Sequence, residues 1–363
     1  MAAAPSHPLA GAGLRIETAE EVAPVGAEWE RLADAAGAGP FVRPGWFEAW
    51  LRAFRAGRDV AVVCARRGNR LAGVVPMLRR GQMLRSPTNW HTAGFGAVAE
   101  DEEVARALAA ALVDMGSTIL DVSFLDPAEG FAAQLEAAAR DAGRGLISRP
   151  VLRSPYIDLH GDFEQFEGTL DSKFRRETRR RRRKLEEQGE VTLSFVDGRD
   201  GLDPLLDEGF AVEGSGWKDA GGTAIASNET TERFYRDVAS WAAGRGWLQL
   251  GFLRLDGRAV AFSYCVVLAG TVNVVKVGFD PGLRAFAPGT LLTRETIARA
   301  FEQEMSCYDF LGAPDAYKLD WTSSVRERVR VQAFGRTPLG LLGHAAWRYG
   351  RPLAKRATQL VRR

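Results

Sequence analysis

The chain has 363 residues, of which 46% are hydrophobic and 26% are charged, and its formal net charge is +2 at pH 7. This composition excludes a disordered protein and supplies enough apolar residues for two globular domains. The charge is unevenly placed, because residues 173–184 hold nine basic residues and one acidic residue, and residues 336–363 hold seven basic residues and no acidic one.

The N-terminal segment MAAAPSHPLAGAG lacks the basic start and the long apolar run of a signal peptide. We therefore expect a cytoplasmic protein with no transmembrane span. Cys64, Cys265 and Cys307 lie far apart in apolar runs, and the four histidines are scattered. This pattern predicts reduced thiols in the core and no metal site.

The first half of the chain predicts a β-hairpin over residues 60–77, a helix over 103–112 and a strand from 119. A shift of 188 residues places these segments, without a gap, on the hairpin 248–265, the helix 291–300 and the strand from 307. The chain therefore contains two copies of one α/β unit. We predict an α/β (α+β) fold in which each unit is a mixed, mostly antiparallel sheet flanked by helices.

The predicted division has three parts. Residues 1–150 form the first unit, residues 151–337 form the second unit, and residues 338–363 form a basic amphipathic tail.

A single helix is predicted over residues 171–189, with Asp171 as N-cap and Gly189 as the stop. Phe174 and Leu185 are its only strongly apolar side chains, and nearly every face is cationic. Such a helix packs weakly or meets an anionic partner. Nucleic acid, acidic polysaccharide, a lipid-linked sugar diphosphate, anionic lipid and a donor phosphate all fit this charge. We favour an anionic acceptor or a membrane surface.

The second unit contains a strand over 271–278, a Gly/Pro-punctuated loop and a helix that begins at Gly289 or Thr290. A helix N-terminus presents unpaired backbone N–H groups and a dipole that favours negative charge, so this segment suits a phosphate. The first copy has Glu100, Asp101 and Glu102 at the equivalent positions. Those carboxylates would repel a phosphate, and we expect only the second copy to bind an anion there.

The whole chain resembles the CelD-like branch of the GNAT acyltransferases, which is related to the Fem peptidyltransferases. The resemblance covers about residues 28–335 and rests most on GFDPGLRAFAPGTLL (278–292) and YDFLGAPDAYKLDW (308–321). It implies two tandem GNAT-like units, with a degenerate first unit and an active second unit. The loop reads RAFAPGT, which contains less glycine than the corresponding loop of typical GNAT enzymes.

The resemblance implies that acetyl-CoA or another acyl-CoA is the co-substrate. Its phosphates would lie against the end of the strand, the loop and the helix start. The residues predicted to bind it are Lys276, Val277, Gly278, Arg284, Ala287, Pro288, Gly289 and Thr290.

Three residues are predicted to act in catalysis. Tyr317 occupies the place where GNAT enzymes commonly have a tyrosine that protonates the leaving thiolate, and Lys318 the place where Fem relatives have a functional lysine. Glu213, which precedes the cleft-lining sequence GSGWK, is chosen as general base.

Acceptor contacts are predicted for Trp217, Lys218 and Asp309. Asp309 has a counterpart in the first copy, Asp121, so a shared structural hydrogen bond also explains it.

The tail after Gly340 alternates apolar and basic residues, and Pro352 divides it into two short helical pieces. Basic amphipathic helices lie in lipid headgroup regions, so peripheral membrane contact at the inner face is one expectation. A helix packed on the domain is the other.

These features predict an acyl-CoA-dependent N-acyltransferase acting on an envelope saccharide, polysaccharide or precursor. Two GNAT-like units in one chain lessen the need for a dimer, so a monomer is compatible with the sequence. Two alternatives remain open. One is a Fem-like transferase that takes an aminoacyl group from charged tRNA. The other is a non-catalytic module that binds anionic glycan, lipid or RNA.

Overall fold

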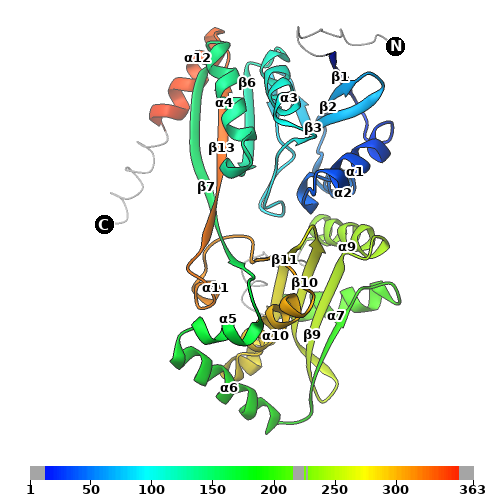
Figure 1. Ribbon diagram of the computed structural model, residues 1–363, viewed down its shortest axis with the longest axis vertical. Helices are drawn as coiled ribbons and strands as arrows, with labels where there is room; N and C mark the ends of the chain where they lie inside the picture. Colours follow the sequence, from blue (N-terminus) through cyan, green and yellow to red (C-terminus); the bar gives the residue numbers. More distant parts are fainter. Residues whose placement is uncertain (1–12, 216–224, 226–227, 351–363) are drawn as a thin grey trace. The chain divides into compact units, whose positions relative to one another are not determined.

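The computed structural model describes residues 13–215, 225 and 228–350. Its internal contacts divide the chain into two compact units (Figure 1). Unit 1 comprises residues 1–48, 55–152 and 327–363, and unit 2 comprises residues 49–54 and 153–326.

Unit 1 is built on a mixed sheet in the order β1-β2-β3-β4-β6-β13, with β5 paired to β3. Neighbouring strands are antiparallel except β4 and β6, which are parallel. Helices α3 and α4 pack on it, and their apolar side chains share a core with the strands. The elements are β1 (Leu14–Ala19), α1 (Gly26–Ala35), α2 (Pro44–Phe54), β2 (Asp59–Arg67), β3 (Arg70–Arg80), β4 (Met83–Arg85), β5 (Val98–Ala99), α3 (Glu102–Asp114), β6 (Ile119–Leu125), α4 (Phe131–Asp141), β13 (Val325–Phe334) and α12 (Pro338–Ala345). Residues 49–54 of α2 and residues 325–326 of β13 group with unit 2.

The strand β7 (Gly145–Asp158) carries the chain into unit 2, whose sheet has the order β7-β12-β11-β10-β9-β8. Only β11 and β12 are parallel neighbours there. The elements are α5 (Phe163–Thr169), α6 (Ser172–Glu186), β8 (Val191–Val196), α7 (Leu202–Gly214), α9 (Glu229–Gly244), β9 (Leu248–Leu255), β10 (Arg258–Leu268), β11 (Thr271–Phe279), η4 (Pro281–Phe286), α10 (Pro288–Glu302), β12 (Cys307–Asp309) and α11 (Ala316–Leu319).

The helices of unit 2 cover both faces of its sheet, as the alternation of side chains along β10 shows. Tyr264 points toward α9, where its hydroxyl donates to the Tyr235 carbonyl oxygen at 3.0 Å. The next residue, Cys265, shares a core with Ile297 of α10. Therefore α7 and α9 lie on one face and α10 on the other. Figure 1 shows α10 across the strands β9, β10 and β11.

The internal repeat is present in the element boundaries. The strands β3 and β10 begin at residues 70 and 258, β4 and β11 at 83 and 271, and β6 and β12 at 119 and 307, a constant offset of 188. Two pairs of elements nearer the start of each unit have a smaller offset. The strands β1 and β8 begin at 14 and 191, an offset of 177, and the helices α1 and α7 begin at 26 and 202, an offset of 176. The helices α2 and α9 begin at 44 and 229, an offset of 185, so unit 2 holds nine more residues than unit 1 between the start of α7 and the start of α9.

The C-terminal strand differs from the predicted division. Residues 327–337 were predicted to end the second unit, whereas the structure places residues 327–363 in unit 1. The cause is β13, in which Val329 to Phe334 pair with β6 of the first unit.

Candidate functional site

The helix α10 begins where a tight left-handed turn follows η4. Ala287 has φ 48° and ψ 54°, Pro288 occupies the first helical position, and Leu291 N donates to the Ala287 carbonyl oxygen at 3.1 Å. In the described part of the chain, no side chain caps this helix, and its first turn contains no acidic residue. The backbone N–H groups of Gly289 and Thr290 therefore form an N-terminus suited to an anion.

The equivalent helix of unit 1, α3, has a different N-terminus. Asp101 is its N-cap and accepts a hydrogen bond from Val104 N at 2.9 Å. Arg67 binds Glu100, Asp101 and Glu103, which fixes the acidic cluster at the helix end. Carboxylates of unit 1 thus lie at the N-terminus of α3, whereas the first turn of α10 in unit 2 contains no acidic residue.

The strand before α10 separates from its parallel neighbour. The register of β11 with β12 covers Thr271–Asn273, whereas the register of β11 with β10 continues to Phe279. A β-bulge lies in the β10–β11 pairing between Tyr264 and Cys265, where Lys276 and Val274 are their partners. The carboxyl ends of parallel strands lie at one edge of a sheet, so the loop after β12 and the loop before α10 follow the same edge.

Glu213 and Lys276 both lie close to Tyr235. Glu213 is 1% exposed, and its Oε2 accepts a hydrogen bond from Ile225 N at 2.9 Å. Lys276 Nζ lies 5.1 Å from the centre of the Tyr235 ring. Burial raises the pKa of the Tyr235 phenol well above its ordinary value, and the Glu213 carboxylate adds to the effect. Glu213, the predicted general base, and Lys276, which is predicted to bind acyl-CoA, therefore belong to one polar cluster with Tyr235.

Gly278 permits the approach of α7 to this cluster. A Cβ at Gly278 would lie 2.4 Å from Glu213 Cα. Gly278 thus has a packing role, since any larger residue would push the helix that carries Glu213 away from β11. Its neighbour Val277 pairs with Ser263 of β10.

Tyr317 lies on α11 with 41% of its surface exposed. Desolvation raises the pKa of its phenol, and the Asp315 carboxylate raises it further. The hydroxyl is therefore protonated at neutral pH, as a proton donor must be.

Lys318 is buried, with 6% of its surface exposed. Its Nζ donates to the carbonyl oxygens of Leu311 at 3.0 Å and Ala313 at 2.8 Å, and lies 3.0 Å from Asp315 Oδ2. These three acceptors match the three donors of an ammonium group, so Lys318 holds the turn before Tyr317 in place. Its catalytic role stays a prediction.

Asp309 makes structural hydrogen bonds, as its counterpart Asp121 in the first unit suggested. Its Oδ1 accepts from Leu311 N at 2.8 Å, and its Oδ2 lies 3.1 Å from Arg326 Nη1. In unit 1, Asp121 pairs with Arg330. Both units thus use this aspartate to bind an arginine of β13. The other predicted acceptor contacts, Trp217 and Lys218, lie outside the described residues.

Asp171 is the N-cap of α6, as predicted, and accepts from Phe174 N at 2.9 Å. The helix packs through Leu185, which is buried, and through Phe174, whose ring meets Trp321 edge-on at 5.0 Å. It lies against η4, where Arg284 is exposed.

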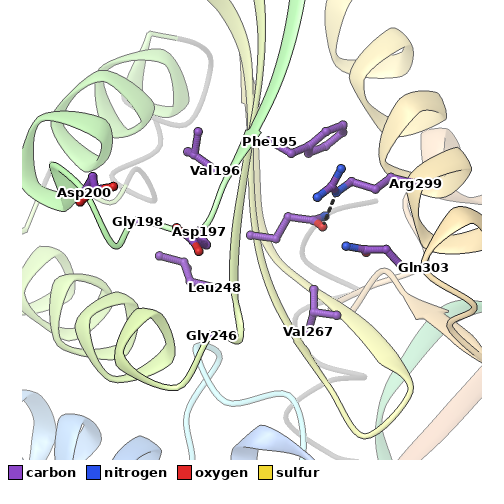
Figure 2. Close-up of a pocket in the computed structure, with 11 residues that line it drawn as sticks. Phe195, Val196, Asp197, Gly198, Asp200, Gly246, Leu248, Val267, Arg299 and Gln303 are labelled. Carbon is purple, nitrogen blue, oxygen red and sulfur yellow. Dashed lines mark hydrogen bonds between the residues drawn. The ribbon is translucent and has the colours of Figure 1, made fainter.

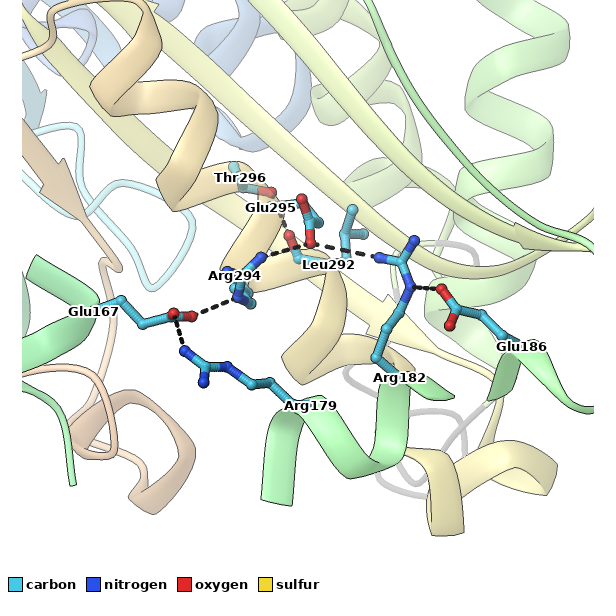
Figure 3. Close-up of polar contacts among 8 residues, drawn as sticks. All are labelled: Glu167, Arg179, Arg182, Glu186, Leu292, Arg294, Glu295 and Thr296. Atoms are coloured by element: carbon cyan, nitrogen blue, oxygen red, sulfur yellow. Dashed lines mark hydrogen bonds and ion pairs between the residues drawn. The ribbon is translucent and has the colours of Figure 1, made fainter. Parts of the chain in front are cut away.

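Part of the cationic surface of α6 is neutralised within unit 2. Glu167 lies 2.9 Å from Arg179 Nη2 and 2.7 Å from Arg294 Nε of α10. Arg182 lies 2.7 Å from Glu186 and 3.5 Å from Glu295 (Figure 3). The helix is therefore attached to α5 and α10 by ion pairs, and Lys173, Arg176, Arg183 and Lys184 are exposed.

A separate open pocket of about 490 Å³ lies beside β8 and β9 (Figure 2). Arg299, near the C-terminus of α10, donates from Nε to Gln249 Oε1 at 3.0 Å and lies over the Phe195 ring. None of the predicted site residues in the described ranges lines it. Because it includes the last turn of α10, it is distinct from the open N-terminus of that helix.

The three cysteines, Cys64, Cys265 and Cys307, are buried and free, in agreement with the prediction. Burial raises the pKa of Cys64 and Cys265 to about 12 and that of Cys307 to about 11. Their thiols stay protonated at neutral pH and contribute to packing.

Residues 172–319 match the family model described as an acetyltransferase (GNAT) domain. The match covers α6 to α11 and includes the open N-terminus of α10. No curated protein matches the chain.

Three solved structures resemble both units. FemX has a TM-score of 0.62 at 12% identity, covering 90% of this chain and 100% of that one. A conserved protein of unknown function from Bacteroides thetaiotaomicron has a TM-score of 0.56 at 13% identity, covering 88% and 100%. The C-terminal domain of a putative lysylphosphatidylglycerol synthetase from Agrobacterium fabrum has a TM-score of 0.54 at 15% identity, covering 87% and 94%. At such identities the likeness shows the fold. Together with the acetyltransferase (GNAT) domain match, it confirms the predicted GNAT-like α/β fold.

Proposed function

We infer that unit 2 is an acyltransferase that takes its acyl group from acyl-CoA and binds the donor's pyrophosphate at the N-terminus of α10. The match of residues 172–319 to an acetyltransferase domain supports the reaction class. The observation that carries the donor site is that the N-terminus of α10 has no acidic residue and no side-chain cap, whereas the N-terminus of α3 is capped by Asp101.

The residues around this helix start fit a pyrophosphate. Gly289 and Thr290 offer backbone N–H groups, and the dipole of a 15-residue helix favours the anion. A Cβ at Gly289 would meet the Phe279 ring at 3.2 Å, so glycine lets the turn lie close to the strand. The exposed Arg284 precedes the turn.

Acyl transfer to an amine requires the amine to lose a proton and the departing thiolate to gain one. Tyr317 is the proposed proton donor, because it lies on α11 shortly after β12, where the resemblance to GNAT enzymes places the tyrosine that protonates the thiolate. Glu213 is the proposed proton acceptor. It lies with Tyr235 and Lys276 in the buried cluster beside the β10–β11 bulge.

The acceptor is proposed to be an amine on an anionic envelope saccharide or its precursor. The exposed basic residues of α6, which packs against η4, support an acceptor of negative charge. The CelD-like resemblance of the sequence supports a saccharide.

A second candidate is a transferase that uses aminoacyl-tRNA. FemX, with a TM-score of 0.62, and the lysylphosphatidylglycerol synthetase domain, with a TM-score of 0.54, share the fold of this chain, which supports this candidate. The exposed Lys173, Arg176, Arg183 and Lys184 would bind nucleic-acid phosphates in this case.

Two ligand assays separate the candidates. Coenzyme A at saturating concentration should raise the melting temperature of the full chain, because a ligand that binds only the folded state stabilises it. Filter binding with charged tRNA should then detect no complex at 150 mM salt. No shift with coenzyme A together with retention of tRNA would replace the first candidate by the second. Failure of both ligands would favour a binding module without catalysis.

A further inference from the structure

The short helix α12 follows β13 and presents small residues to the protein. Thr337 caps it by accepting a hydrogen bond from Gly340 N at 3.1 Å. A Cβ at Gly340 would lie 2.1 Å from the Gly335 carbonyl oxygen, and one at Gly343 would lie 3.3 Å from the Phe334 ring. His344 packs on the Phe334 ring at 5.4 Å. This inner face fixes the helix closely against the end of β13.

The outer face of α12 is apolar and exposed. Leu339 is 61% exposed, Leu341 59% and Leu342 68%. These are three of the eight large apolar residues that are exposed in the described ranges, and Ala345 and Ala346 extend the same surface. Three neighbouring leucines directed into water on one short helix indicate a surface that a partner covers.

The charge around this face indicates what the partner is. Arg336 and Arg348 flank the helix and are exposed. Residues 336–363 contain seven basic residues and no acidic residue. A second copy of the same surface would bring two such sets of positive charge together with no local counter-charge, which disfavours self-association through this face.

We propose that α12 docks on the surface of a bilayer containing anionic lipid. The three leucines enter the boundary between headgroups and acyl chains, and the exposed Arg336 and Arg348 lie among the lipid phosphates. An anionic bilayer surface binds segments in which apolar and cationic side chains lie next to one another. In the described ranges no helix is long and apolar enough to span a bilayer.

The proposal is tested by co-sedimentation of the full chain with phosphatidylcholine vesicles that contain or lack 30% phosphatidylglycerol, at roughly physiological salt. The test variant is Leu339→Gln with Leu341→Gln and Leu342→Gln, since glutamine retains helix propensity while removing the apolar surface. The matched control is Leu193→Gln, which alters an exposed leucine of β8. A chain ending at residue 350 removes five of the seven basic residues.

We expect the full chain and the Leu193 control to bind the anionic vesicles. The triple variant should lose at least roughly tenfold in affinity for them. The shortened chain should also lose affinity and much of its dependence on phosphatidylglycerol. The far-ultraviolet circular dichroism of the triple variant should match that of the full chain.

Three outcomes would overturn the proposal. One is equal sedimentation of the full chain with and without vesicles. Another is a folded triple variant that binds as strongly as the full chain. The third is a dimer in light scattering that becomes a monomer in the triple variant, which would assign the leucines to self-association. Donor binding in unit 2 is measured separately and does not affect these results.

Discussion

Tyr235 and Tyr264 place hydroxyl groups in unit 2 where the offset of 188 puts Phe47 and Pro76 in unit 1. Both tyrosines are buried, and Tyr264 donates to the Tyr235 carbonyl oxygen. The offset places Tyr235 opposite Phe47, and Tyr235 is not among the predicted site residues. A polar group that only one copy contains, at a buried position, is the signal that could have identified this cluster.

Tyr317→Phe tests the proton donor. Removing the hydroxyl should lower kcat roughly 100-fold while the donor KM changes little, because general acid catalysis contributes mainly in the transition state. Steady-state kinetics with acetyl-CoA measure both constants. Leu319→Ala alters an exposed residue of the same short helix and should leave kcat within about twofold. A fall in kcat for both variants would assign the effect to the helix, and full activity of Tyr317→Phe would exclude the role.

At the element scale, the ion pairs of Glu167 join α5, α6 and α10. Desolvation raises the pKa of Glu167, but the hydrogen bonds from Arg294 and Arg179 outweigh it, and the net pKa lies below 4.5. A depressed carboxyl pKa contributes stability that is complete above the unfolded pKa and is lost as the pH falls through the folded value.

Glu167→Gln should therefore lower the free energy of unfolding by about 1–2 kcal/mol at pH 7 and by much less near pH 3. Urea denaturation at the two pH values measures the difference. Glu102→Gln removes the exposed i,i+4 pair with Arg106 on α3 and should cost under about 0.5 kcal/mol at either pH. An equal cost of Glu167→Gln at pH 3 and pH 7 would contradict the ion-pair explanation.

The packing of α7 on β11 gives a second prediction at this scale. Gly278→Ala should destabilise unit 2 by about 1–3 kcal/mol, because the added Cβ would displace the backbone at Glu213. Gly168→Ala adds the same atom where nothing lies within 4 Å and should be close to neutral. Thermal denaturation compares the two. If Gly278→Ala leaves the melting temperature unchanged, the contact between α7 and β11 has room for a Cβ and the packing role of Gly278 is wrong.

At the scale of the whole molecule, the repeat could be predicted where both copies keep equal lengths. The strands β3 and β10, the last residues of α3 and α10, and the strands β6 and β12 follow one offset. The pairs β1/β8 and α1/α7 could not be found in this way, because the additional residues before α9 change the offset. The pairing of β13 with β6 was also missed, since it joins segments about 200 residues apart and leaves no local pattern.

The candidate site could be predicted only in part. The open N-terminus of α10 follows from the absence of acidic residues in the sequence. The burial of Lys318 does not, because a lysine in a polar turn is usually exposed, and its three acceptors come from a turn that only the folded chain forms.

The central claim is that α10 of unit 2 binds the donor and that α3 of unit 1 does not, because their N-termini differ in charge. Calorimetric titration of coenzyme A into the double variant Gly289→Asp, Thr290→Glu tests it most directly, with Gly289→Asn, Thr290→Gln as the uncharged control of the same size. We predict that the acidic variant folds and loses at least roughly 100-fold in affinity, whereas the uncharged control stays within about tenfold of the original chain. Unchanged affinity in the acidic variant would contradict the account and place the donor elsewhere.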